Sequence, residues 1–214
     1  MNKLILFELN EVPVRIIDYY RQIRPNSWIA QNFDYLNKFE SYSENIGHLS
    51  PWNTWPTLHR GVTNDKHYIS DFNQDLTQTD KDFPPIWKIL ADHKIKVGVF
   101  GSLHSYPLPQ NFENYSFYVP DVFSPSSECH PKQIELFQDI NLKLSRKSAR
   151  NVDSKIPFGD ALKLGIKSGS LGFKLSTIAE VGSHLVGERF NRWKTVRRRT
   201  YQSVLAFDVF YKLL

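Results

Sequence analysis

The feature that most constrains the fold is an alternation of amphipathic helical segments with short apolar runs. Residues 3–9 form a brief apolar run, which predicts a buried strand. Residues 14–23 then carry apolar side chains at helical spacing, and Pro25 ends that helix. The order predicts a strand–loop–helix unit, whose loop lies where α/β sheets place their ligands.

A second set of elements follows the same order. A helix is predicted over residues 86–93 after Pro84-Pro85, then strands over 95–100 and 115–119. A longer helix begins at Glu128 or Pro131 and runs to residue 146. Such alternation indicates an α/β fold with a mostly parallel sheet flanked by helices.

The pattern changes after residue 147. Five glycines interrupt a weak helical periodicity up to about residue 186, which we interpret as a helical insertion or cap. The sequence therefore divides into an α/β part, residues 1–147, and a helical C-terminal part, residues 148–214. Because the last helix reaches Leu214 without a capping signal, we expect the chain to be an incomplete portion of a longer domain.

Positive charge is concentrated near the C-terminus. Six of the 27 Lys and Arg residues fall within residues 189–199, and Phe190, Trp193 and Val196 lie between them at helical spacing. This predicts an amphipathic helix that faces solvent, an anionic membrane surface or nucleic acid. No nucleic-acid-binding motif accompanies the charge, so no specific nucleic-acid partner is expected.

Composition limits the class of protein. The 214 residues are 41% hydrophobic and 23% charged, as in ordinary globular domains. Cys129 is the single cysteine, which excludes an intramolecular disulfide and a cysteine-based zinc site. No apolar run approaches the ~20 residues of a membrane span, and residues 4–7 are too short for a signal peptide, so a cytoplasmic location is expected.

Residues 50–63 carry the strongest chemical signal. Thr54 precedes a Trp55-Pro56 pair, and proline favours the first position of a helix. A hydroxyl just before that position would face unpaired N–H groups, and a metal ion could make it a nucleophile. The alternative is a threonine helix cap with no chemical role.

Three stretches share an order and spacing with one enzyme family. They are residues 4–11; the Thr54-Trp55-Pro56-Thr57 segment with Val62-Thr63 and His67-Tyr68-Ile69; and residues 85–90, 96–100 and 105–107. Together they resemble the alkaline phosphatase superfamily, in particular its type I phosphodiesterase/nucleotide pyrophosphatase branch. The resemblance covers roughly residues 3 to 125 and implies an alkaline phosphatase-like fold.

The resemblance implies a metal-dependent hydrolase of phosphate mono- or diesters. Thr54 would be the nucleophile, forming a covalent phosphothreonine, and a ligand of two divalent ions, zinc or manganese. Asn10, or Glu8, would be a further metal ligand. Asn53 and Thr57 would donate hydrogen bonds to an oxygen of a small phosphorylated substrate.

The chain also departs from the family. Asn10 stands where the family has a metal-binding aspartate, and Glu8 or Glu11 would have to supply the missing charge. The family's later Asp and His ligands have no counterpart here. The alternative is therefore a non-catalytic or truncated relative that binds a phosphorylated ligand or a partner protein. Four histidines near these loops are more often structural than ligands: His48, His59, His67 and His104.

Overall fold

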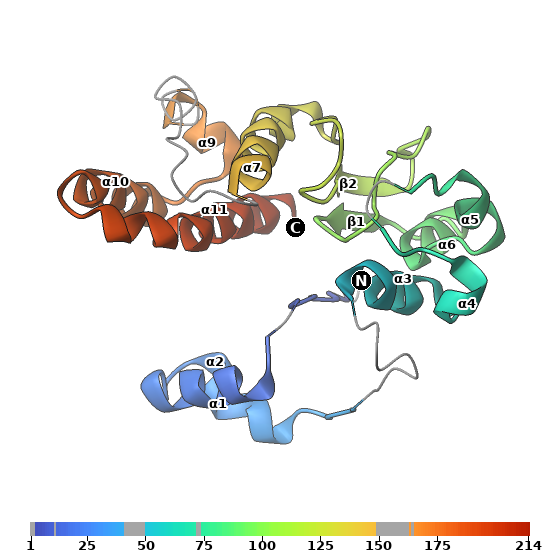
Figure 1. The fold of residues 1–214 in the computed structure, drawn as a ribbon, viewed down its shortest axis with the longest axis horizontal. Coiled ribbons are helices and arrows are strands. Elements are labelled where there is room, and N and C mark those ends of the chain that lie inside the picture. The colour runs from blue at the N-terminus through green and yellow to red at the C-terminus, as the bar shows by residue number, and fades with distance from the viewer. Residues whose placement is uncertain (1–2, 11, 41–49, 72–73, 149–162, 164) are drawn as a thin grey trace.

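The computed structural model describes the chain except for residues 1–2, 11, 41–49, 72–73, 149–162 and 164. The fold is α/β and mostly helical, with one small parallel sheet at its centre (Figure 1). In chain order the helices before the sheet are α1 Val14–Ile23, α2 Trp28–Asn32, η1 Phe33–Tyr35, α3 Pro51–Arg60, α4 Asn64–His67, α5 Thr77–Asp82 and α6 Ile86–Asp92. Those after it are η3 Lys132–Ile134, α7 Glu135–Ser148, α9 Ser168–Leu171, α10 Leu175–Phe190, η4 Arg192–Arg197 and α11 Arg198–Leu213.

The sheet consists of strands β1 (Val97–Phe100) and β2 (Tyr115–Val119), which pair in parallel. Both strands and their parallel pairing confirm the prediction from sequence, although β1 begins two residues later than expected. The register is irregular between Val97 and Gly98, and Gly98 faces Phe117 across the pair. The carboxyl ends of both strands therefore lie at one edge of the sheet.

Two clusters of buried side chains hold these elements together. The smaller joins α6 to the sheet, through Trp87, Ala91, Val99, Tyr115 and Tyr118. The larger joins β2 to α7 and to the C-terminal helices, through Val119, Cys129, Ile134, Phe137, Leu171, Phe173 and Val209. The described residues after position 164 thus share a core with the sheet.

The strand predicted over residues 3–9 is not present. These residues belong to neither a helix nor a strand, and Leu4, Leu6 and Phe7 are exposed. A strand requires a neighbouring strand for its backbone hydrogen bonds, and residues 3–9 do not pair with β1 or β2. The segment passes along α3 instead, and Phe7 meets Phe207 of α11 edge to face.

Most predicted helices are confirmed, with shifts at their ends. Residues 14–23 form α1, and residues 86–92 form α6. The longer helix starts later than expected, because a 3₁₀ turn, η3, precedes α7 at residue 135.

The helix predicted over residues 189–199 is not continuous. Asn191 adopts an extended conformation after α10, and its Oδ1 accepts a hydrogen bond from Trp193 N. This cap starts η4, and α11 follows from Arg198. Asn191 ends one helix and begins the next, as capping asparagines commonly do.

Among the described residues, none of the helices is both long and apolar enough to cross a bilayer.

Candidate functional site

Helix α3 carries the predicted nucleophile, and it begins earlier than the sequence suggested. Ser50 is its N-cap and Pro51 its first residue. The Ser50 hydroxyl accepts from Trp52 N at 3.3 Å, and Asn53 Oδ1 accepts from Ser50 N at 3.3 Å. This reciprocal capping box satisfies the start of the helix. Asn53, expected to bind a phosphoryl oxygen, is used here as a capping residue.

Thr54 lies in the first turn of α3 and is not its cap, which corrects the expectation from the Trp55-Pro56 pair. Its Oγ1 donates to Ser50 O at 3.0 Å, and its backbone N–H donates to the same carbonyl. Pro56 lies inside the helix. The segment contains two start signals, and the Ser50-Pro51 signal prevails because Asn53 completes its capping box. The Thr54 side chain is exposed to solvent.

Thr57 has a different environment, one turn further along. Its hydroxyl donates to Asn53 O at 2.8 Å and lies 2.9 Å from Nε2 of His67. His67 Nδ1 accepts from Ile69 N, so the Nε2 atom carries the proton and donates to Thr57. His67 is fully buried, and this burial, with Arg60 and His104 nearby, lowers its pKa. Thr57 is therefore part of a buried structural network.

Residues 8–10 cross the same helix from far away in the sequence. Glu8 Oε1 lies 2.7 Å from His59 Nε2, and Asn10 Oδ1 accepts from Trp55 Nε1 at 3.0 Å. Trp55 and His59 are four residues apart and share one side of α3. The segment thus runs toward the N-terminal turn of α3, and Asn10 contacts the residue next to Thr54. The sequence placed Asn10 directly after a strand of the sheet, whereas the structure brings it to α3 without that strand.

These residues do not fit a two-metal centre. The Glu8 carboxylate is paired with His59, and the Asn10 oxygen is occupied by Trp55. Within the described parts of the chain, no three His, Cys, Asp or Glu side chains are grouped so that they could hold a metal ion. Glu11 and His48 lie outside the described residues. A zinc or manganese pair therefore has no ligand set among the residues described.

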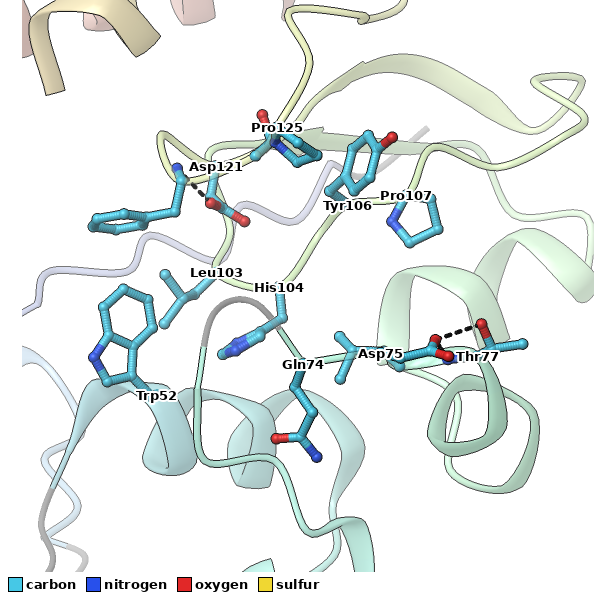
Figure 2. A pocket seen from close by; sticks show the side chains of 13 residues that line it. Trp52, Gln74, Asp75, Thr77, Leu103, His104, Tyr106, Pro107, Asp121 and Pro125 are labelled. Carbon is cyan, nitrogen blue, oxygen red and sulfur yellow. Dashed lines mark hydrogen bonds between the residues drawn. The ribbon is translucent and has the colours of Figure 1, made fainter. Parts of the chain in front are cut away.

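A cavity of about 310 Å³ opens at the carboxyl edge of the sheet (Figure 2). Its walls come from the loop after β1, the loop after β2, the segment before α5, and Trp52 of α3. The labelled residues in Figure 2 are Trp52, Gln74, Asp75, Thr77, Leu103, His104, Tyr106, Pro107, Asp121 and Pro125. No Lys or Arg belongs to the described lining, which instead contains the carboxyl groups of Asp75 and Asp121, so the cavity does not suit a phosphoryl group.

Asp121 and His104 are the buried titratable groups of the cavity. Asp121 is buried, which raises its pKa, although Phe123 N donates to its Oδ1 at 2.8 Å. His104 has a φ of 60° and is buried, and its Nδ1 has no hydrogen-bond partner among the described residues. Burial lowers the pKa of His104. Burial thus favours the neutral form of each group.

Asp121 was missed at the sequence level, although a signal was available. It follows the 115–119 strand by two residues, and polar residues just after parallel strands lie at the ligand-binding edge of the sheet. His104 was named, but nothing in the sequence indicated its left-handed backbone.

Trp52 and Thr54 are two residues apart in α3, so they point to different sides of the helix. The cavity and the Thr54 hydroxyl are separate features.

Comparison with known proteins gives no further assignment. No family model, curated protein or solved structure matches the chain.

Proposed function

We propose that the chain carries the nucleophile of a hydrolase acting on phosphate mono- or diesters, and that Thr54 is that nucleophile. One observation carries the proposal. Thr54 presents an exposed hydroxyl in the first turn of α3, on a helix that Asn10 and Glu8 contact from more than 40 residues away. This arrangement agrees with the order of the motifs that resemble type I phosphodiesterases.

Thr54 is also the better of the two neighbouring hydroxyls. Thr57 is held between Asn53 O and the buried His67, so an attacking role would break a satisfied network. Thr54 makes one bond, to the Ser50 carbonyl, which uses its proton and leaves both oxygen lone pairs as acceptors. An incoming phosphorus atom could reach this oxygen from solvent.

The proposed reaction has two steps. The Thr54 oxygen forms a bond to phosphorus and loses its proton to solvent, while the ester P–O bond breaks and the alcohol leaves. Water then attacks the phosphothreonine and releases phosphate or a phosphomonoester, restoring the hydroxyl. Because the described residues do not fit the metal pair, neither step is assigned to a metal ion.

The test is to trap the intermediate. The chain is incubated with a nitrophenyl phosphodiester or monoester, with and without zinc or manganese, quenched in acid and digested for mass spectrometry. We expect a phosphoryl group on the peptide that contains Thr54. Thr54→Ala should abolish both this adduct and nitrophenol release, whereas Thr54→Ser should retain part of the rate.

Ser203→Ala is the matched control for this test. Ser203 is an exposed hydroxyl in α11 that donates to the carbonyl four residues earlier, as Thr54 does. Its loss should leave the adduct and the rate unchanged. If Thr54→Ala folds normally and turns over like the parent, Thr54 is not the nucleophile.

A second candidate function is favoured by the engaged state of Glu8 and Asn10. Both are used to hold residues 8–10 against α3, as expected for a non-catalytic relative that binds a phosphorylated ligand or a partner protein. Saturable binding of a nitrophenyl phosphate without any adduct at Thr54 would favour this second function.

A further inference from the structure

The corner between α10 and α11 is a fixed structure. Arg198 Nε donates to both oxygens of Glu188, at 2.9 and 3.0 Å, and its Nη2 donates at 2.6 Å. Such a forked pair fixes orientation as well as distance. A Cβ on Gly187 would lie 3.1 Å from Lys194 Nζ, so η4 folds closely against the end of α10. Figure 1 places this corner at the left end of the molecule, away from the sheet.

This corner displays large apolar side chains to solvent. Phe190 is 88% exposed and Trp193 is 87% exposed, while Val186 and Val196 are exposed by more than half. Val186 and Phe190 are four residues apart on α10, and Trp193 and Val196 are three apart on a 3₁₀ helix. Each pair therefore lies on one side of its helix. Exposed apolar residues that lie on one side of a helix are typical of interaction surfaces.

Cationic side chains alternate with these apolar residues along the chain. Arg189, Lys194 and Arg197 are exposed, and the sequence contains no Asp or Glu from position 189 to 207. The charge of Glu188 is already matched by Arg198. The surface thus combines aromatic and aliphatic side chains with an uncompensated positive charge.

We propose that this basic apolar corner, residues 186–197, docks onto an anionic membrane surface. Tryptophan and phenylalanine partition into the headgroup region of a bilayer, and Lys and Arg pair with anionic lipid headgroups. Nucleic acid would use the charges and stack on the rings but has no use for Val186 and Val196. A second copy of the chain would bring like charges together, which opposes self-association.

The experiment is sedimentation of the full chain with vesicles of phosphatidylcholine alone, or with 30% phosphatidylserine. We expect binding to the anionic vesicles that weakens in 0.5 M NaCl, because salt screens the charges. The Phe190→Ser/Trp193→Ser variant should lose most of this binding. The Arg189→Gln/Lys194→Gln/Arg197→Gln variant should bind roughly a hundredfold more weakly, at about fivefold for each charge removed.

Two matched variants test specificity. Trp28→Ser/Phe39→Ser removes two aromatic residues that are also exposed, and Arg15→Gln/Arg24→Gln/Lys81→Gln removes the same number of exposed cations elsewhere. Both should bind like the parent. All altered side chains are exposed, so thermal melting should confirm that every variant is folded.

Three results would overturn the proposal. The first is equal binding to neutral and anionic vesicles. The second is a matched variant that loses as much binding as the corner variant. The third is an absence of vesicle binding. In that case, binding of the parent and the corner variant to single-stranded RNA, and their self-association in analytical ultracentrifugation, would show whether the corner binds RNA, a second copy of the chain, or neither.

Discussion

Two threonines three residues apart show how position in a helix decides what a hydroxyl can do. Thr54 Oγ1 makes one hydrogen bond at an exposed position, whereas Thr57 Oγ1 joins Asn53 O and His67 Nε2 in a partly buried network. A net hydrogen bond is worth about 1 kcal/mol, but a buried group left unpaired costs about 1–3 kcal/mol. We therefore expect the Thr54 hydroxyl to be available for reaction and the Thr57 hydroxyl to contribute to the stability of the fold.

This contrast gives a direct stability prediction. Thr57→Val keeps the branched shape but leaves the His67 Nε2–H without an acceptor, so the free energy of unfolding should fall by about 1–3 kcal/mol. Thr54→Val removes an exposed hydroxyl and should change it by less than about 0.5 kcal/mol. Urea unfolding followed by circular dichroism measures both. Equal losses in the two variants would show that the His67 network does not stabilise the fold.

His67 also predicts how stability depends on pH. Its pKa is lowered in the folded chain, first by burial and then by the charges of Arg60 and His104. The unfolded chain, in which His67 has an ordinary pKa of about 6.5, therefore binds a proton at this residue more readily than the folded chain does. This contribution to stability is fully present above that pH and is lost as the pH falls through the folded pKa. The limiting slope is about 1.4 kcal/mol per pH unit for one proton.

The His67→Gln variant isolates this effect. Glutamine keeps an N–H donor but does not titrate in this range. Unfolding free energies of the parent and the variant should converge as the pH is lowered from 7.5 to 5. A constant difference between them over that range would contradict a lowered His67 pKa.

At the scale of elements, the sequence predicted those whose signals are local. The helix at 14–23, the helix predicted over 86–93 and observed over 86–92, and the strand at 115–119 follow from periodicity and proline positions. Residues 3–9 could not be predicted in this way, since a strand forms only if a partner strand is available. The apolar run has the composition of a strand, yet it lies against α3 and α11.

Competing local signals explain the other differences. In α3 two proline start signals lie five residues apart, and only side-chain geometry shows that Asn53 completes the earlier one. In residues 189–199 the helical spacing is real on both sides of Asn191, but the asparagine cap divides it. The candidate site could be predicted to the level of the helix that carries Thr54. The engagement of Glu8 by His59 depends on tertiary packing and could not.

Gly98 in strand β1 leaves room for a side chain of the neighbouring strand β2. A Cβ on Gly98 would meet the ring of Phe117 at 2.2 Å, so the ring occupies the space where a side chain would stand. Phe117 is itself buried, so the ring has little room to move. Gly98→Ala should therefore reduce the free energy of unfolding by about 1–3 kcal/mol through overpacking.

Gly182 is the matched control, because it lies inside α10 and nothing would contact its Cβ within 4 Å. Gly182→Ala should increase stability by about 0.5–1 kcal/mol, since alanine favours helix. A second change, Phe117→Leu, should recover part of the Gly98→Ala loss. If Gly98→Ala is as stable as the parent, the close approach of the two strands is not required.

At the scale of the whole molecule, the N-terminal segment connects the parts of the fold. Phe7 contacts α11, Glu8 contacts α3, and the large core joins β2 to α7 and α11. The Glu8 carboxylate is therefore already paired with His59, and a metal ion would have to compete with this partner. Releasing it to a metal would leave the buried His59 without its carboxylate, which has an energetic cost.

This competition leads to a prediction about metal binding by the full chain. Isothermal titration with zinc or manganese should show weak binding without saturation at two ions per chain, because the described carboxylate and amide oxygens are already engaged. His59→Phe frees Glu8 from its partner and fills the space beside Trp87, and should strengthen zinc binding if Glu8 is a latent ligand. His59→Phe/Glu8→Gln should lose that gain. Tight saturation of the parent at two ions would mean that Glu8 leaves His59 readily, and would restore the two-metal mechanism at Thr54.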